Sequence, residues 1–375
     1  MKKNEHYGLR TWVEIDTRAI RTNYRVFRKL IPREVKMMGV VKSNAYGHNF
    51  TEFALELEKL GVNMLAVDSI LEALALRAAR VQVPILVLGY TLPEMFPKAV
   101  GKNIHLTISS VEGLKTLLKY SNAHKIPVHI KIDTGMHRQG FLRHEQEKLF
   151  EILGSAPKKI NISGLYTHFA AGKDPSNTAS TEKQLEVFEL WRDSFSAFGY
   201  TPLVHAGATG GALVFPEAHF DMVRIGIGLY GIPAAATLRG RVALKPVLSW
   251  KTIVAEIKEI PKGVGVGYDH THTTKRVTRT AVCPVGYWHG YPRALSNNAE
   301  VLIAGKRVPV LGRISMDMIV VDITDIPRVK MGDEVVLIGS SKNEEVSAVQ
   351  LAERAGTTAY EILTRLNPLM KRIYR

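Results

Sequence analysis

The chain has 375 residues, 46% of them hydrophobic, and 50 Lys and Arg residues stand against 35 Asp and Glu residues (50 − 35 = +15). This composition is typical of a globular protein and excludes a disordered or fibrous chain, and the length allows one large core or two domains. The mean hydropathy is −0.02. Because no apolar run approaches the roughly 18 residues that a membrane helix needs, we expect no conventional membrane span.

The amino-terminal segment, MKKNEHYGLRTWVEID, has two lysines but no apolar stretch after them. We therefore expect no secretion signal and a location in the reducing cytoplasm. Cys283 is the only cysteine, so the sequence predicts no internal disulfide and no metal site built from cysteine pairs. We expect no bound metal.

The isoelectric point near 9.7 raises nucleic acid as a possible partner. Basic residues are spread along the chain, however, and form no stripe. The excess charge is better explained by a solvated basic surface that attracts anionic ligands. We expect neither a nucleic-acid partner nor a membrane partner.

Short apolar runs alternate with segments of helical periodicity through the first two thirds of the chain. There are eight such runs, at residues 35–42, 64–69, 84–89, 104–109, 128–134, 162–169, 203–209 and 222–227. Helical segments such as 50–61 and 181–199 lie between them. This alternation predicts an α/β fold, a (β/α)8 TIM-type barrel over residues 17–240, although an open doubly wound sheet gives a similar pattern.

Polar residues stand where several of these runs end. They are Lys42, Asp133, His168, Thr209 and Arg224. The chemistry of a barrel sits at the carboxyl ends of its strands, whereas an open sheet gathers its ligands at one switch point. Polar groups at five strand ends therefore favour the barrel.

From about residue 240 the pattern changes to strands without long helices between them. Strand-like runs occupy residues 247–260, 279–287, 299–314, 318–324 and 332–339. Turn signals such as PKG (261–263), AGK (304–306) and GDE (332–334) separate several of the strands, and two short helices are expected in 347–356 and 360–368. This pattern predicts a mainly-β C-terminal domain over residues 241–375. The early segment 11–16 is expected to add a strand to it.

Lys42 ends the first apolar run, in VVKSNAYGHN. Partial desolvation at such a position favours the neutral, nucleophilic amine that condenses with an aldehyde cofactor. The residue pattern alone leaves open a lysine that simply reaches solvent.

The segment VVKSNAYGHN also resembles the cofactor-lysine signature of the alanine racemases, fold-type III enzymes that use pyridoxal 5′-phosphate (PLP). Further matches follow in the family's order: HIKIDTGMHRQG (129–140), LYTHFA (165–170), VRIGIGLYG (223–231), GVGYDH (265–270), GRISMDM (312–318) and YEILTRL (360–366). Several matching motifs are far more specific than one. The resemblance implies an isomerase that interconverts L- and D-alanine and supplies D-alanine for peptidoglycan.

The resemblance implies two acid/base residues. Lys42 would hold PLP covalently and then act as one base, and Tyr268, in GVGYDH, would be the other. Racemisation requires such a pair because the α-carbon must lose its proton on one face and regain one on the opposite face.

The same resemblance implies that Arg224 hydrogen-bonds the pyridine nitrogen of PLP and that His168 supports this arginine. Because a guanidinium does not release its proton, that nitrogen would stay unprotonated. Without the resemblance, Arg224 is better explained as a buried ion-pair partner and His168 as a core histidine. The family's phosphate-binding positions correspond to Tyr46, Thr209, Gly226, Ile227 and Tyr360.

On the substrate side, Arg138 matches the arginine that contacts the substrate carboxylate, and Lys131 matches a lysine often carbamylated in the family. An unmodified Lys131 paired with a carboxylate is the alternative. Met316 and Asp317 match residues that approach the substrate from the β domain. In the family these residues and the second tyrosine come from the other subunit, so the resemblance implies a homodimer with a shared active site.

The chain departs from the family pattern at several positions near these motifs. Ala208 and Ala359 stand where Asn is common, Thr209 where Ser is usual, Ser315 where Cys is frequent, and Trp288-His289 where Ala-Asp is typical. None of these changes removes a predicted catalytic group. Trp288 and His289 are expected near the entrance, so the breadth of accepted substrates stays open.

Three alternatives accompany this interpretation. A racemase of serine, lysine or broad specificity would carry the same reaction motifs. A fold-type III decarboxylase would use a cysteine acid in the β domain, whereas Cys283 lies in the strand-like TAVCPVG. A non-catalytic PLP-binding homeostasis protein resembles the barrel alone and lacks the domain that supplies Tyr268 and Met316.

Overall fold

The computed structural model describes residues 6–156, 159–176 and 178–375, which form two compact units. The barrel unit comprises Ile20–Ala45 and Phe50–Lys245. The β unit comprises the chain up to Ala19, the short insertion Tyr46–Asn49 and Pro246–Arg375. The segment that follows the first barrel strand is thus divided between the two units, because Ala45 belongs to the barrel unit and Tyr46 to the β unit.

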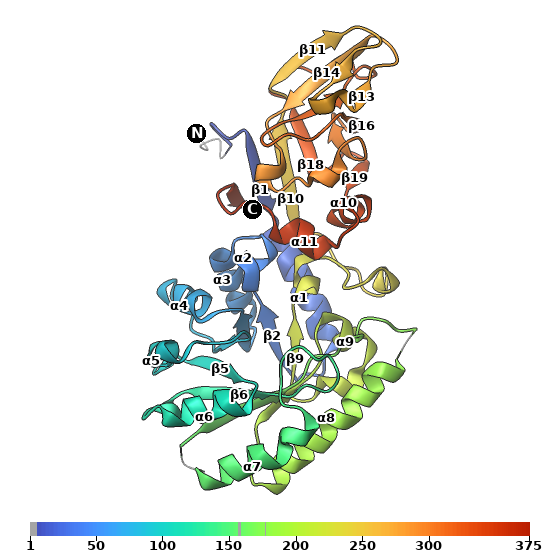
Figure 1. The fold of residues 1–375 in the computed structure, drawn as a ribbon. Coiled ribbons are helices and arrows are strands. Elements are labelled where there is room, and N and C mark those ends of the chain that lie inside the picture. Colours follow the sequence, from blue (N-terminus) through green and yellow to red (C-terminus); the bar gives the residue numbers. More distant parts are fainter. Residues whose placement is uncertain (1–5, 157–158, 177) are drawn as a thin grey trace. The chain divides into compact units, whose positions relative to one another are not determined.

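The barrel unit contains an eight-stranded parallel sheet in the order β8-β7-β6-β5-β4-β3-β2-β9 (Figure 1). Its strands are β2 (Lys36–Val40), β3 (Met64–Val67), β4 (Ile85–Val87), β5 (Ile104–Ile108), β6 (Pro127–Lys131), β7 (Asn161–Tyr166), β8 (Leu203–His205) and β9 (Met222–Ile225). The two ends meet where the Arg224 N–H donates to Gly207 O at 2.9 Å and the Asp221 N–H donates to Val204 O at 3.1 Å. The sheet is therefore a nearly closed barrel. The predicted barrel is confirmed, and every one of the eight apolar runs contains a strand.

Most residues of the barrel strands are buried, whichever face of the sheet they lie on, as their sequences predict. Every residue of β3 and of β4 is buried. Parallel strands covered by helices lose solvent on both sides, which explains why their sequences are continuous apolar runs and show no alternation.

Helices follow most of the barrel strands and surround the sheet (Figure 1). They are α1 (Thr17–Leu30), α2 (Lys42–Tyr46), α3 (Phe50–Leu60), α4 (Ile70–Ala78), α5 (Phe96–Ala99), α6 (Val111–Lys119), α7 (Gln146–Ser155), α8 (Ala179–Ala197) and α9 (Thr209–Val214). The long helix α8 buries Phe188, Trp191 and Phe195, which recur three or four residues apart, and Phe195 packs on Phe150 of α7. Burying each such side chain contributes roughly 1.5–3 kcal/mol to folding. Within the described residues, no helix combines the length and apolarity needed to cross a membrane.

The β unit is built on a ten-stranded sheet in the order β11-β14-β17-β16-β15-β18-β10-β1-β20, with β19 paired to β18. Its strands are β1 (Thr11–Ile15), β10 (Leu248–Ile253), β11 (Glu256–Ile260), β14 (Thr278–Cys283), β15 (Glu300–Ile303), β16 (Lys306–Leu311), β17 (Ile319–Asp322), β18 (Glu334–Ser341), β19 (Glu344–Val346) and β20 (Lys371–Tyr374). The amino-terminal β1 lies between β10, antiparallel to it, and β20, parallel to it. Two short helices, α10 (Ala348–Ala355) and α11 (Ala359–Thr364), precede β20.

One strand prediction needs correction. The run 247–260 is not a single strand but two, β10 and β11, which join different parts of the sheet. The break falls where the Val254 N–H donates to Asp333 O and the Ala255 N–H donates to Val282 O. Periodicity does not reveal such a change of partner because both strands mix polar and apolar residues, so the sequence runs on without a turn signal between them.

Candidate active site

The segment α2 follows barrel strand β2, begins with Lys42 and is a left-handed turn, not a regular α-helix. Ser43, Asn44, Ala45 and Tyr46 all have positive φ, between 48° and 57°. This conformation costs roughly 1–2 kcal/mol for each residue that has a Cβ atom. Such strain is stable only where the surrounding structure holds it, and it concentrates at functional sites.

Glu72 holds this turn next to the end of the neighbouring strand β3. Its carboxylate accepts the Ser43 N–H at 2.9 Å and the Asp68 N–H at 2.7 Å. Asp68 in turn lies 3.5 Å from the half-buried Lys42 Nζ. Asp68 and Glu72 are not among the residues predicted from the sequence, although Asp68 lies near the end of an apolar run as the predicted site residues do.

Arg224 lies on β9 and is buried. Its Nη1 donates to His205 Nδ1 (2.9 Å) and His205 O (3.1 Å), and its Nη2 donates to Thr167 O and Ala206 O (both 2.7 Å) and to His168 Nδ1 (3.2 Å). Burial lowers the pKa of Arg224 to about 10, so the guanidinium is charged at neutral pH. In the described part of the chain it has no carboxylate partner, and its Nε–H has no acceptor.

His168 supports this arginine, as the structure places its Nδ1 within hydrogen-bond distance of the guanidinium. Because a guanidinium only donates, Nδ1 of His168 accepts and its proton resides on Nε2. Burial, and then the charge of Arg224, lower the pKa of His168 to about 3. His168 is therefore a neutral acceptor at physiological pH.

Thr209 begins α9 and faces the turn after β9. Its hydroxyl oxygen accepts the N–H of Gly226 at 3.0 Å and that of Gly228 at 3.5 Å, so its own O–H is left to donate. A Cβ on Gly228 would lie 2.4 Å from the Phe27 ring, so only glycine allows this close packing. Ile227 opens a 3₁₀ turn, where N–H groups lack partners within the helix. Ala208, the N-cap of α9, makes no side-chain cap, consistent with the amide lost from the family pattern.

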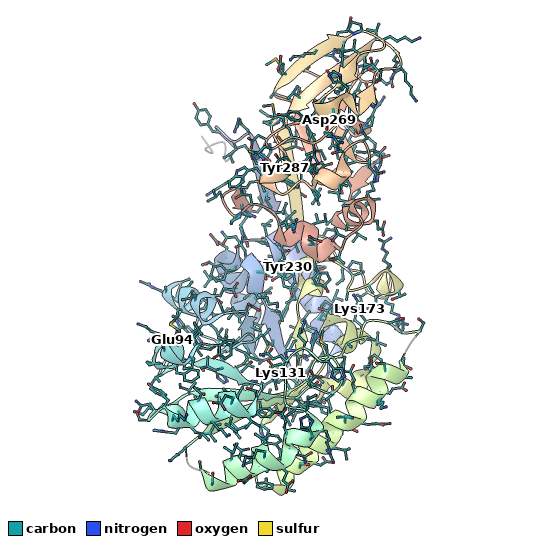
Figure 2. The ribbon with its side chains drawn as sticks, in the orientation of Figure 1. Glu94, Lys131, Lys173, Tyr230, Asp269 and Tyr287 are labelled. Atoms are coloured by element: carbon teal, nitrogen blue, oxygen red, sulfur yellow. The ribbon has the colours of Figure 1, made fainter. Side chains whose placement is uncertain are left out.

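Lys131 ends strand β6 and lies among the barrel strands (Figure 2). Its Nζ donates to Gln139 Oε1 at 3.0 Å and lies 5.5 Å from the centre of the Tyr166 ring. Burial lowers its pKa to about 8, and the charges of Arg138 and Arg224 act in the same direction. Within the described residues Lys131 makes no ion pair, so the structure offers an amide, not a carboxylate, as its partner.

The loop that carries Arg138 is fastened by Asp133. The Asp133 carboxylate accepts four successive backbone N–H groups at 3.0 Å, those of residues 135–138. Burial alone would raise the pKa of Asp133, but these hydrogen bonds outweigh it and hold that pKa below its usual range. The Arg138 side chain is exposed, so it is available to an anionic ligand.

In the β unit, Tyr46 and Tyr360 lie together, with ring centres 5.9 Å apart. Burial raises the pKa of Tyr360 to about 12 and raises that of Tyr46 further. Both hydroxyls therefore stay protonated and able to donate hydrogen bonds.

Tyr268 belongs to a turn of the β unit and is 68% exposed. The next residue, Asp269, has a φ of 57°, and its carboxylate forms an ion pair with Arg313, with 2.7 Å between Oδ2 and Nε (Asp269 is labelled in Figure 2). This ion pair fastens the turn that presents Tyr268. Lys42 and Tyr268 thus belong to different units of the chain.

Met316 and Asp317 form the tip of a tight turn that lies against the segment Tyr287–Trp288. The N–H groups of Tyr287 and Trp288 donate to Ser315 O (3.1 Å) and Met316 O (3.0 Å). No acceptor is found among the described residues for the N–H groups of Met316 and Asp317 themselves. The Asp317 carboxylate lies 3.9 Å from His289 Nδ1, so the unusual histidine contacts a predicted site residue.

Two family models match the chain, described as the N-terminal domain of alanine racemase over residues 15–234 and its C-terminal domain over residues 247–374. The chain belongs to the alanine racemase family. The racemase of Halothermothrix orenii is 37% identical over 368 residues, covering 97% of both chains, and alanine racemase 2 of Bacillus subtilis is 38% identical over 375 residues, covering 97% of this chain and 94% of that protein.

Solved structures of alanine racemases share the fold over nearly the whole length. The Bacillus anthracis enzyme with bound L-Ala-P is 36% identical with a TM-score of 0.91, covering 98% of this chain and 95% of that one. The Bartonella henselae enzyme with covalently bound pyridoxal phosphate is 32% identical with a TM-score of 0.87, covering 97% and 99%. As a member of this family, the protein is a PLP-dependent isomerase that interconverts L- and D-alanine.

The residues of the barrel unit fit PLP. The buried Arg224 offers a charged Nε–H that has no acceptor in the described part of the chain, which suits the lone pair of a pyridine nitrogen. Thr209 offers a free hydroxyl proton beside glycine backbone, which suits a phosphate oxygen. Lys42, half-buried at the end of β2, offers the amine for covalent attachment.

The structure also shows contacts that the sequence analysis missed. His105, His129 and His205 interrupt three of the apolar runs, and the last of them hydrogen-bonds Arg224. A histidine that recurs inside buried strands is a sequence signal that could have predicted these contacts. Gln139, the partner of Lys131, carried no such signal because a single amide in a loop is ordinary.

Proposed function

We propose that Lys42 and Tyr268 are the two acid/base residues of this alanine racemase and that Arg224 binds the pyridine nitrogen of PLP. The observation that carries this proposal is the buried guanidinium of Arg224, whose Nε–H lacks an acceptor among the described residues. When bound, PLP withdraws electrons from the α-carbon of the amino acid and makes its proton acidic. An arginine at the ring nitrogen keeps this effect moderate, which disfavours reactions other than proton return.

Each base serves one enantiomer in this proposal. Lys42 Nζ removes the α-proton of D-alanine, and the Tyr268 hydroxyl protonates the opposite face to give L-alanine. The reverse reaction exchanges their roles, with Tyr268 Oη as the base. Two groups on opposite faces are required because a single base mostly returns the proton to the face it left.

The phosphate of PLP is proposed to bind hydroxyl and backbone donors. The protonation of these hydroxyls supports the proposal. Tyr46 and Tyr360 keep their protons because burial raises their pKa values. The Thr209 oxygen accepts hydrogen bonds from two backbone N–H groups, so its own proton is left to donate. The backbone of Gly226 and Ile227 completes the set.

The substrate carboxylate is proposed to bind the exposed Arg138 and the N–H group of Met316, with Asp317 beside it. We further propose that Lys131 is carbamylated. Its pKa of about 8 supplies the neutral amine that attacks carbon dioxide, releasing one proton as the carbamate forms. The new anion would face Arg138 and replace the amide contact to Gln139.

A homodimer with a shared site is proposed as the active form. The β unit has several large apolar side chains that are exposed in the single chain and that a dimer could bury. They are Tyr268, Tyr287, Trp288, Met316 and Met318, each at least 44% exposed. Exposed aromatic and methionine side chains are typical of protein interfaces. We place the dimer in the cytoplasm, where it would supply D-alanine for peptidoglycan.

Borohydride reduction tests the cofactor assignment. The purified protein should be yellow, and borohydride should remove its visible absorption band by fixing PLP to Lys42. Peptide mass spectrometry should find the adduct on Lys42 and on no other lysine. An adduct on Lys131, or no bound PLP after reconstitution, would contradict the proposal.

A panel of amino acids tests the breadth of the substrate. Alanine should show α-proton exchange and loss of optical rotation without release of carbon dioxide. Serine and lysine belong in the panel because Trp288 and His289 depart from the family pattern near Asp317. Faster racemisation of serine or lysine would reassign the substrate, and carbon dioxide release would indicate a decarboxylase.

A further inference from the structure

Three histidine rings lie in series inside the barrel and end at Arg224. His205 Nδ1 is 2.9 Å from Arg224 Nη1, His205 Nε2 is 2.8 Å from His129 Nδ1, and His129 Nε2 is 3.1 Å from His105 Nδ1. The rings come from strands β8, β6 and β5. A hydrogen-bonded path therefore joins the buried guanidinium to His105, which is half-buried near the amino end of β5.

The direction of this path follows from the chemistry of arginine. A guanidinium has donors and no acceptor, so His205 Nδ1 must accept its hydrogen bond. A neutral imidazole has one N–H, which for His205 is then on Nε2 and donates to His129 Nδ1. The same reasoning puts the proton of His129 on Nε2, from which it donates to His105 Nδ1. Each ring is thus the neutral Nε2–H form, and each bond points away from Arg224.

The surroundings keep the rings neutral. Burial lowers the pKa of all three histidines, that of His105 to about 4 and those of His129 and His205 well below the ordinary range. The charge of Arg224 adds to this effect for His129 and His205, and that of Arg77 for His105. No carboxylate forms a hydrogen bond or ion pair with any of the three rings within the described residues.

The barrel makes room for the central ring. Gly164 on β7 is paired with His129, and a Cβ at position 164 would lie 2.2 Å from His129 Nδ1. Only glycine fits there. On the other side, the Tyr166 ring stacks on His205, with centres 4.8 Å apart and planes 4° from parallel. Both neighbours hold the rings in the orientation that the series of hydrogen bonds requires.

We propose that His105 is a positioning residue for Arg224, acting as the terminal acceptor of a one-way series of imidazole hydrogen bonds. The acceptor at His105 orients His129, His129 orients His205, and His205 Nδ1 holds one arm of the guanidinium. The inference rests on the proposed function, in which the Arg224 Nε–H faces the ring nitrogen of PLP. A guanidinium whose Nη1 is held less firmly would be less well aligned, and the cofactor would be less strictly restricted to racemisation.

Neutron diffraction from the perdeuterated holoenzyme tests the series directly. Deuterons are expected on Nε2 of His105, His129 and His205, with none on their Nδ1 atoms. A deuteron on Nδ1 of His129 or His205, or a doubly deuterated ring, would overturn the proposal. This measurement does not depend on where PLP binds, so it separates the inference from the cofactor assignment.

Two substitutions at His105 test the consequence. His105→Leu removes the acceptor and leaves the buried His129 N–H unpaired, whereas His105→Gln retains an acceptor oxygen. Loss of one buried hydrogen bond corresponds to about a tenfold effect, so in H105L we expect kcat about tenfold lower with KM nearly unchanged. The share of turnovers in which alanine gives its amino group to the cofactor and leaves as pyruvate should rise by a similar factor. His105→Gln should remain within about threefold of wild type in both respects.

The matched control is His124→Leu, because His124 is an exposed histidine outside the series. It should behave as wild type. Equal losses in the Leu and Gln variants, or wild-type kcat and pyruvate yield in H105L, would overturn the positioning role. If H105L fails to fold, the deuteron positions and the Gln variant still decide the question. An adduct away from Lys42 would instead defeat the proposed function while leaving the deuteron pattern intact.

Discussion

The guanidinium of Arg224 is buried and has no carboxylate partner among the described residues, which is a costly state for a charge. Five acceptors offset that cost, three of them backbone carbonyls and two of them histidine nitrogens. Neutral acceptors leave the positive charge uncompensated. The site therefore keeps a permanent donor for a ligand, which a salt-bridged arginine would not provide.

Tyr268, in contrast, is exposed, and substituting it tests the two proposed bases separately. In Tyr268→Phe, Lys42 remains, so D-alanine in heavy water should still exchange its α-hydrogen slowly with retention. L-alanine should hardly exchange, and racemisation should fall by roughly 10²–10⁴-fold, as expected for loss of a positioned acid/base group. Proton NMR of each enantiomer measures the exchange.

The unequal response of the two enantiomers is the decisive feature of that experiment. Equal exchange of both enantiomers in Tyr268→Phe, or near wild-type racemisation, would mean that another group acts as the second base. Tyr268 would then be a structural residue of its turn.

Lys131 predicts a dependence of stability on pH. Its pKa is about 8 in the folded chain and 10.5 when unperturbed, so between these values the unfolded chain binds more protons. Stability should therefore rise with pH across this window, by up to roughly 3 kcal/mol for a shift of this size. Urea unfolding in buffer free of carbon dioxide should show this rise in wild type and not in Lys131→Met.

Carbamylation would change the outcome in a defined way. A carbamate does not take up a proton in this window, so added bicarbonate should flatten the wild-type curve. Parallel curves for wild type and Lys131→Met without bicarbonate would show that Lys131 does not titrate as described.

At the scale of elements, the turn after β2 depends on α4, a helix that is not next to the turn in the sequence. Glu72, in the first turn of α4, forms a capping box with Ser69 and also accepts the N–H groups of Ser43 and Asp68. One carboxylate thus fastens two strand-end loops. The strained turn that carries Lys42 is held by this contact from a neighbouring βα unit.

Substitution of Glu72 should therefore destabilise more than loss of a cap. Glu72→Ala is expected to lower the free energy of unfolding by roughly 1.5–2 kcal/mol, about 1 from the cap and the rest from the two lost hydrogen bonds to a charged carboxylate, whose exposed N–H groups water can reach. Glu112→Ala is the control, because Glu112 occupies the first turn of α6 without a capping box. Denaturant unfolding that shows equal losses in the two variants would contradict this role.

At the scale of the whole molecule, the predicted bases are carried by different units of the chain. If the active dimer shares its sites, mixing inactive Lys42→Ala subunits with inactive Tyr268→Phe subunits should restore activity. A heterodimer then has one intact site and one doubly broken site. Random exchange makes half of the dimers mixed, so about one quarter of wild-type activity is expected.

The control mixes Lys42→Ala with the double variant, which contains no intact site in any combination. Native mass spectrometry establishes that subunits exchange. Exchange without recovered activity would show that each site is complete within one chain.

The sequence by itself determined the fold class and most of the elements. Eight apolar runs became eight barrel strands, since burial on both faces requires continuous apolar sequence. The motifs also identified the family, because matches in order along the whole chain rarely arise together by chance. Local composition and local motifs are properties of the chain before it folds.

Only the tertiary structure decided which distant residues meet. The split of run 247–260 into β10 and β11 depends on hydrogen-bond partners from other strands, which no local pattern encodes. The same holds for Glu72 with Ser43, for Gly164 beside His129, and for Gln139 with Lys131. Hydrogen bonds and close contacts act over about 3–4 Å in space, whatever the separation along the chain, so they exist only once the strands are placed side by side.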